Sequence, residues 1–173
     1  MNTRFIYIIS LIFVTALSRL LPHPAEFTPV LSIAIFSGAT LFNKRDSILV
    51  PLFAMFISDI FLGFHSLIPV VYSCIVFISL YSNRFVQTKN ITSILFTSFL
   101  SGFFFFLVTN FAVWLTSGMY SLDLVGLQTC YLAAIPFFRN SLAGTVIYST
   151  LLFGLFFLIE KYLLITKTST QKI

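Results

Sequence analysis

Charged residues are scarce in this chain of 173 residues. Only 9% of its residues are Asp, Glu, Lys or Arg, whereas soluble domains carry roughly 25%. The chain therefore lacks the polar side chains that a water-exposed surface needs. In their place, 58% of the residues are hydrophobic, and 23 of them are phenylalanine. This composition excludes an ordinary soluble domain and indicates a protein that is solvated by lipid.

Residue types that bind metals or carry out catalysis are also few. The two cysteines, Cys74 and Cys130, are far apart, and neither they nor the two histidines form a CxxC or HExxH pattern. The sequence also has no GxSxG motif, no P-loop and no paired carboxylates on one helix, which are typical of common catalytic sites. We therefore expect no catalytic residues, no metal and no cofactor, so an enzyme is not predicted.

Six hydrophobic runs are close to the length of transmembrane helices, which need about 20 apolar residues. They predict an all-α fold, a polytopic membrane helix bundle that forms a single integral membrane domain over residues 1–173. The predicted spans are 5–21, 28–42, 47–62, 67–81, 91–116 and 141–159. Polar residues interrupt the remaining stretch 118–138, and Pro136 is expected to break any helix there. We expect that stretch to be a re-entrant or a surface segment.

The distribution of basic residues predicts the orientation of the bundle, because cytoplasmic loops are enriched in Lys and Arg. With six spans, both termini fall on the side that holds most of the basic residues, and we expect that side to be cytoplasmic. The net charge of +5 then indicates contact with anionic membrane lipid, and no nucleic acid partner is expected. The basic residues on that side are Arg4, Lys44, Arg45, Arg84, Lys89, Lys161, Lys167 and Lys172.

Polar residues gather on the opposite, predicted outer side. Arg19 and Arg139 are the remaining basic residues, and Asp59 lies within the apolar run 55–63. A charge at the centre of a bilayer costs about 2.5–3.5 kcal/mol, so Asp59 needs a partner such as an arginine. Three interpretations are open. The pair only joins two helices, it contributes to a polar ligand pocket, or Asp59 is solvated at the membrane interface.

Further residues at a similar depth are candidates for ligand binding. Asn110 lies in an apolar segment, where its amide needs a partner. Trp114 either stacks on a ligand or belongs to the aromatic belt of the membrane interface. Three prolines stiffen the loop 22–29, which we expect to close over the pocket. The candidate substrate-binding residues are Arg19, His23, Asp59, Asn110, Trp114, Arg139 and Asn140.

Several segments carry a resemblance to a known family. They include Arg19-Leu-Leu-Pro-His-Pro, Ser58-Asp-Ile-Phe-Leu-Gly63, Thr109-Asn-Phe-Ala-Val-Trp114 and the stretch 130–140. Over residues 15–155, the sequence resembles a family of uncharacterised bacterial small integral membrane proteins, a domain of unknown function. The resemblance implies a multi-pass protein of the bacterial inner (cytoplasmic) membrane, and it implies no activity.

The predicted architecture carries a second, looser resemblance. Six spans, an outer loop with prolines, a short second helix and the Asp59-to-Gly63 end of the third span resemble the substrate-binding S component of energy-coupling-factor transporters. This implies that a small polar or vitamin-like solute binds from the outer face, and that a coupling subunit with ATPases is a partner. The first span lacks the AxxxA pattern with which many S components dock that subunit. The alternative function is a structural or assembly membrane protein without a ligand.

Overall fold

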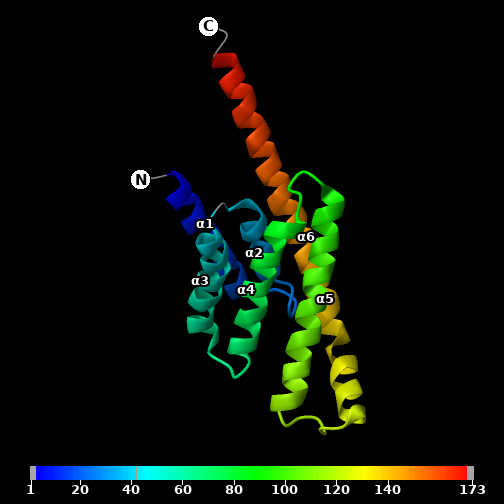
Figure 1. Cartoon of the computed structure of the whole chain (residues 1–173). Helices are drawn as coiled ribbons and strands as arrows, with labels where there is room; N and C mark the ends of the chain where they lie inside the picture. Colours follow the sequence, from blue (N-terminus) through cyan, green and yellow to red (C-terminus); the bar gives the residue numbers. More distant parts are fainter. Residues whose placement is uncertain (1–2, 42, 171–173) are drawn as a thin grey trace.

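A computed structural model describes residues 3–41 and 43–170, and the side chains of residues 8–41 and 43–161. The described residues contain no strand, and consecutive helices run in alternating directions, so that α1 begins and α6 ends at the same end of the bundle (Figure 1). The all-α prediction is confirmed. The helices are α1 (Thr3–Leu20), α2 (Val30–Thr40), α3 (Lys44–Leu62), α4 (Ile68–Phe85), α5 (Ile91–Thr116) and α6 (Leu124–Thr170).

The largest difference from the sequence prediction concerns residues 118–138. Helix α6 runs without interruption from Leu124 to Thr170 and contains Pro136, so the predicted break and the separate segment before residue 141 are wrong. A proline removes one intrahelical hydrogen bond, but membrane helices tolerate this loss where neighbouring helices support the backbone. Here α5 supplies that support, because the Tyr131 hydroxyl donates to the Leu107 carbonyl oxygen at 2.7 Å.

Three helices begin at an Asn or Asp side chain that accepts hydrogen bonds from their first turn. Asn43 Oδ1 accepts from the backbone N–H of Arg45 before α3, and Asn90 Oδ1 accepts from that of Thr92 before α5. Asp123 Oδ1 accepts from the backbone N–H of Gly126 at the start of α6. The first backbone N–H groups of a helix have no intrahelical partner, so such caps fix where a helix begins.

Helix α2 forms the centre of the bundle. All of its residues from Val30 to Gly38 are buried, and Phe36 packs edge-on against Phe153 of α6 at a ring distance of 5.1 Å. Its side chains meet those of α4, such as Ile75, in one core cluster. With 11 residues, α2 is much shorter than a membrane-spanning helix. The other helices surround α2, and this explains why it is buried.

Helices α2 and α4 approach each other closely at Gly38. A Cβ atom on Gly38 would lie 2.2 Å from the carbonyl oxygen of Ser79, and the Asn83 amide donates to the Gly38 carbonyl oxygen at 3.1 Å. The small-xxx-small pattern from Ala34 to Gly38 is of the kind that lets membrane helices pack backbone to backbone. The backbones of α2 and α4 are therefore in direct contact at Gly38.

The helices have the length and composition of a membrane protein. Within the described residues, α4, α5 and the Leu124–Lys161 part of α6 are long and apolar enough to cross a membrane, and two apolar segments, Ile8–Leu20 and α2, are shorter. Large apolar side chains face outward, for example Phe96, which is 64% exposed. Such a surface suits lipid better than water. The prediction of a membrane protein is confirmed, and the count of six membrane passes stays a prediction.

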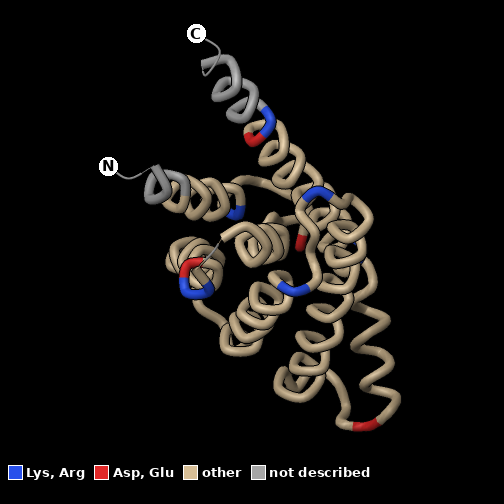
Figure 2. Tube along the Cα trace, turned by 45° about the horizontal axis from the view of Figure 1, so that its top comes forward, with Lys and Arg blue, Asp and Glu red and all other residues tan. Residues whose placement is uncertain are grey.

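Basic residues are concentrated at the end of the bundle where α1 begins and α6 ends. Figure 2 shows them at the turns of the chain on that side, and the Lys89 Nζ atom lies 3.2 Å from Glu160 Oε2. This clustering agrees with the charge pattern from which the orientation was predicted. The residues with described side chains are Lys44, Arg45, Arg84, Lys89 and Lys161. The side chains of Arg4 and Lys167 lie outside the described ones, and Lys172 lies outside the described residues.

Candidate functional site

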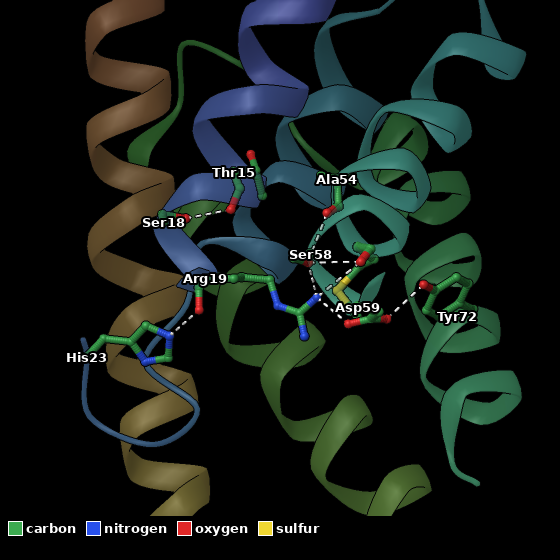
Figure 3. Close-up of polar contacts among 9 residues, drawn as sticks. Thr15, Ser18, Arg19, His23, Ala54, Ser58, Asp59 and Tyr72 are labelled. Carbon is green, nitrogen blue, oxygen red and sulfur yellow. Dashed lines mark hydrogen bonds and ion pairs between the residues drawn. The ribbon is translucent and has the colours of Figure 1, made fainter. Parts of the chain in front are cut away.

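A buried ion pair joins the end of α1 to α3. Arg19 Nη1 lies 2.7 Å from Asp59 Oδ1, and the two side chains are 15% and 2% exposed. The Tyr72 hydroxyl of α4 donates to Asp59 Oδ2 at 2.8 Å. The same Nη1 atom of Arg19 also donates to Ser58 Oγ and, at 3.4 Å, to the Met55 carbonyl oxygen (Figure 3). Both oxygens of the Asp59 carboxylate therefore have a hydrogen-bond donor inside the bundle.

The guanidinium of Arg19 has donors left over. Every hydrogen bond that it makes with the described part of the chain comes from Nη1. A guanidinium has five N–H donors in one plane, and those on Nη2 and Nε have no acceptor among the described residues. Arg19 lines a cavity of about 540 Å³. The ion pair thus anchors the guanidinium through one nitrogen and leaves its other donors for an acceptor in the cavity.

The cavity lies between the α3–α4 turn and the α5–α6 hairpin. The α3–α4 turn contributes His65, and α5 contributes Phe105 and Phe106. Helix α6 contributes Phe137 and Phe138. Four phenylalanines thus form an apolar wall opposite the polar groups of the α1–α2 connection. A concave site of this kind, with few polar groups on an apolar lining, is typical of pockets for small organic ligands.

The 21–29 loop lines this cavity through His23, Glu26 and Thr28. Asn140 Nδ2 of α6 donates to the Ala25 carbonyl oxygen at 3.0 Å, and a Cβ atom on Gly144 would lie 3.3 Å from Phe27 Cα. The loop therefore crosses α6 at residues 140–144, whereas the cavity is lined by α6 residues between 134 and 141. The expected closing of the loop over a bound solute stays a prediction. The loop ends short of the α3–α4 and α5–α6 turns because α1 and α2 are short (Figure 1).

Three of the predicted residues line the cavity: Arg19, His23 and Asn110. Asn110 Nδ2 donates to the Phe106 carbonyl oxygen of its own helix at 2.8 Å, and its Oδ1 accepts no hydrogen bond from the described residues. His23 Nδ1 lies 2.9 Å from the Pro24 carbonyl oxygen, and Nε2 lies 3.3 Å from that of Arg19. His23 therefore also ties the loop to the end of α1.

The other predicted residues do not line the cavity. Asp59 lies behind Arg19, and Asn140 holds the loop from the α6 side. The indole N–H of Trp114 donates to the Ser121 carbonyl oxygen at 2.9 Å, which ties Trp114 to the α5–α6 turn. Arg139 is exposed and lies off the face of α6 that meets the cavity. The structure thus brings Asp59 and Asn140 near the site as supports and leaves Trp114 and Arg139 outside it.

Sequence reasoning did not select three residues of the site. Glu26 and His65 line the cavity, and Tyr72 completes the hydrogen bonding of Asp59. A signal for Tyr72 was present, since α3 and α4 form a hairpin in which residues 59 and 72 are almost equally distant from His65, at the middle of the turn. Glu26 adopts a left-handed backbone, with a φ of 64°, and no sequence pattern indicates that conformation for a glutamate.

Comparison with known proteins places the chain in a family. A family model described as "family of unknown function (DUF6580)" matches residues 1–168. The chain belongs to this family. No curated protein and no solved structure matches the chain. Membership in DUF6580 agrees with the predicted membership in an uncharacterised family and assigns no activity, so a function has to be argued from the cavity and its charges.

The α5–α6 turn of this DUF6580 protein is fixed by polar contacts. The Ser121 hydroxyl donates to Asp123 Oδ1 at 2.9 Å, and the same oxygen accepts from the Gly126 N–H at 2.7 Å. Donation from Gly126 first, and then from Ser121, holds the pKa of the Asp123 carboxyl below its ordinary value. A lowered pKa means that folding stabilises the ionised form of the Asp123 carboxyl group relative to its protonated form.

We expect Asp123→Ala to lower the melting temperature at neutral pH, because α6 loses its N-terminal cap. The contribution of the Asp123 carboxylate to folding stability is complete above the pKa that this group has in the unfolded chain. It is lost as the pH falls through the lowered pKa of the folded protein. The melting temperatures of wild type and variant, followed by the fluorescence of Trp114 in detergent, should therefore converge in acid. A difference that stayed constant from neutral to acidic pH would contradict a role of the ionised carboxylate.

Proposed function

We propose that this protein binds a small polar or amphiphilic solute that carries an anionic group, in the manner of the S component of an energy-coupling-factor transporter. One observation carries the proposal. The guanidinium of Arg19 is anchored through Nη1 by Asp59, and its remaining donors face a cavity of about 540 Å³ without an acceptor from the described residues. Pockets for small ligands have volumes of roughly 300–1,000 Å³.

The chemistry of the cavity suits such a solute. A guanidinium binds a carboxylate or phosphate with two parallel hydrogen bonds, and the ion pair with Asp59 holds it in place before the ligand arrives. Asn110 offers a free carbonyl oxygen to a donor of the ligand. The phenylalanines of α5 and α6 enclose the apolar part of the solute. Binding residues in this proposal are Arg19, His23 and Asn110, with Asp59 and Asn140 as supports.

The orientation and the partners are part of the proposal. The cavity is lined by the α3–α4 turn, which lies at the end of the bundle opposite the start of α1 and the end of α6 (Figure 1). The positive-inside rule then directs the cavity to the outer face of a bacterial inner membrane that the chain crosses six times. The sequence has no P-loop, so the energy for transport comes from a coupling subunit with ATPases, and no reaction is catalysed. Membrane lipid surrounds the bundle.

A structural or assembly role without a ligand is the alternative function. It is favoured by the hydrogen bonds of Asp59, whose two oxygens join α1, α3 and α4 through Arg19 and Tyr72. Such a network stabilises a helix bundle without any solute. The two functions differ in what they predict for a cavity residue that contributes little to folding.

Asn110→Leu is the variant that separates them. The Asn110 amide donates only to its own helix, so we expect the variant to fold while it binds the solute about tenfold more weakly. Native mass spectrometry of the protein in lipid nanodiscs, followed by thermal shifts with small carboxylates, vitamin-like ones included, measures this. Arg139→Gln is the control, because Arg139 does not line the cavity. If no solute is found, the structural function is favoured. If Asn110→Leu binds a solute as tightly as the wild type does, the solute does not bind in the cavity that Asn110 lines.

A further inference from the structure

The cavity contains a second charged group besides Arg19. Glu26 lines the same cavity, and its carboxylate has no hydrogen-bond donor or ion-pair partner in the part of the chain that the structure describes. Asp59 already neutralises Arg19. Arg19, Asp59 and Glu26 together therefore have a formal charge of −1. A simple anion that binds to Arg19 would share the cavity with a carboxylate that has no counterion among the described residues.

The backbone holds Glu26 in a defined place. The Phe27 N–H donates to the Pro24 carbonyl oxygen and the Thr28 N–H to that of Glu26, both at 3.0 Å. Within this turn Glu26 has a φ of 64°, a left-handed conformation that strains a residue with a side chain and that glycine adopts freely. A glycine would thus suit the loop better. Strain of this kind at a cavity points to a role for the side chain.

We infer that the cavity takes a zwitterion that bears an apolar group. The anionic group of the ligand meets the free donors of Arg19, its amine meets the carboxylate of Glu26, and its apolar part lies against the phenylalanines of α5 and α6. This inference rests on the proposed solute-binding function and narrows its substrate class to amino acids and similar molecules with both charges.

Both charges of the ligand are needed for complementarity. A ligand with only a carboxylate leaves Glu26 without a partner in the cavity, and a ligand with only an amine leaves the donors of Arg19 unused. Groups that lose water and gain no partner lower the affinity, so the site discriminates against both kinds of ligand. The phenylalanine rings also favour a ligand with an amine, because an ammonium group is attracted to the face of a ring.

Two matched sets of compounds test the inference on the full-length protein in nanodiscs. The aromatic set is phenylalanine, 3-phenylpropanoate and phenethylamine, and the aliphatic set is leucine, 4-methylpentanoate and 3-methylbutylamine. Within each set only the amine or the carboxylate is removed. We expect calorimetry to show that the zwitterion of at least one set binds about tenfold more tightly than either analogue.

Variants of Glu26 assign that preference to its carboxylate. Glu26→Gln should reduce the difference between phenylalanine and 3-phenylpropanoate to about twofold or less. Glu26→Gly should do the same while it raises the melting temperature, because glycine relieves the left-handed strain. A merely structural role for Glu26 would not change the preference. Glu160→Gln is the control, since Glu160 pairs with Lys89 at the other end of the bundle, and it should keep the preference.

The outcomes separate this inference from the proposed function. If the carboxylates bind the wild type as tightly as the zwitterions, and Asn110→Leu weakens them, solute binding stands and the zwitterion inference is overturned. If none of the six compounds binds but another small carboxylate does, only the zwitterion inference is overturned. If no carboxylate of either screen binds, both are overturned. If Glu26→Gln prefers the zwitterion over 3-phenylpropanoate as strongly as the wild type does, the role of Glu26 is overturned.

Discussion

Asp59→Ala is expected to lower the free energy of unfolding by about 3–5 kcal/mol, the usual cost of removing one partner from a buried ion pair. The variant leaves the guanidinium of Arg19, which is only 15% exposed, without its counterion inside the bundle. It also removes the acceptor of the Tyr72 hydroxyl. Equilibrium unfolding in mixed micelles with increasing denaturing detergent measures the loss.

A double variant distinguishes the two roles of this pair. Arg19→Met with Asp59→Leu should regain most of the lost stability, because replacing a whole buried pair with apolar side chains is often neutral or stabilising. The same protein should bind no solute, since the donors of Arg19 are gone. A loss below about 1 kcal/mol in Asp59→Ala is the value of an exposed pair and would contradict a structural role for this contact.

The ion pair also shows how much of the site could be predicted from the sequence. The cost of a charge in lipid predicts that Asp59 needs a cationic partner, and Arg19 and Arg139 were the two candidates. The choice between them depends on which helix packs against α3. Helix α1 does so and brings Arg19 to Asp59, whereas Arg139 lies on an outward face of α6. Contacts between helices distant in sequence decide this, and a single sequence does not contain them.

The error at Pro136 has a related cause. The propensity of proline predicts a break in an isolated helix, but α5 packs along α6 on both sides of Pro136, through Phe106 against Phe138 and through Tyr131. The prolines of the 21–29 loop correctly predict a rigid connection. The burial of α2 in the core places the loop along the cavity, whereas Trp114, near the end of α5, does not line it.

Gly38→Ala is expected to destabilise the protein by about 1–3 kcal/mol, the usual cost of overpacking a core. The added Cβ atom would lie 2.2 Å from the Ser79 carbonyl oxygen. That oxygen belongs to the backbone of α4 and cannot rotate away, so α2 and α4 have to separate. Separation stretches the hydrogen bond from the Asn83 amide to the Gly38 carbonyl oxygen and loosens the contacts of Ile35 and Ile75 in the core.

Two other glycines provide matched controls for this contact. A Cβ atom on Gly154 of α6 would meet nothing within 4 Å, so Gly154→Ala should gain about 0.5–1 kcal/mol from helix propensity alone. A Cβ atom on Gly102 would lie 3.3 Å from Leu142 Cδ1, a side-chain atom that can move, and Gly102→Ala should fall between the two. If Gly38→Ala unfolds at the same detergent concentration as Gly154→Ala, α2 and α4 do not meet backbone to backbone. We expect Gly154→Ala to be the most stable of the three variants and Gly38→Ala the least stable. This order tests the packing that places α2 at the centre of the bundle.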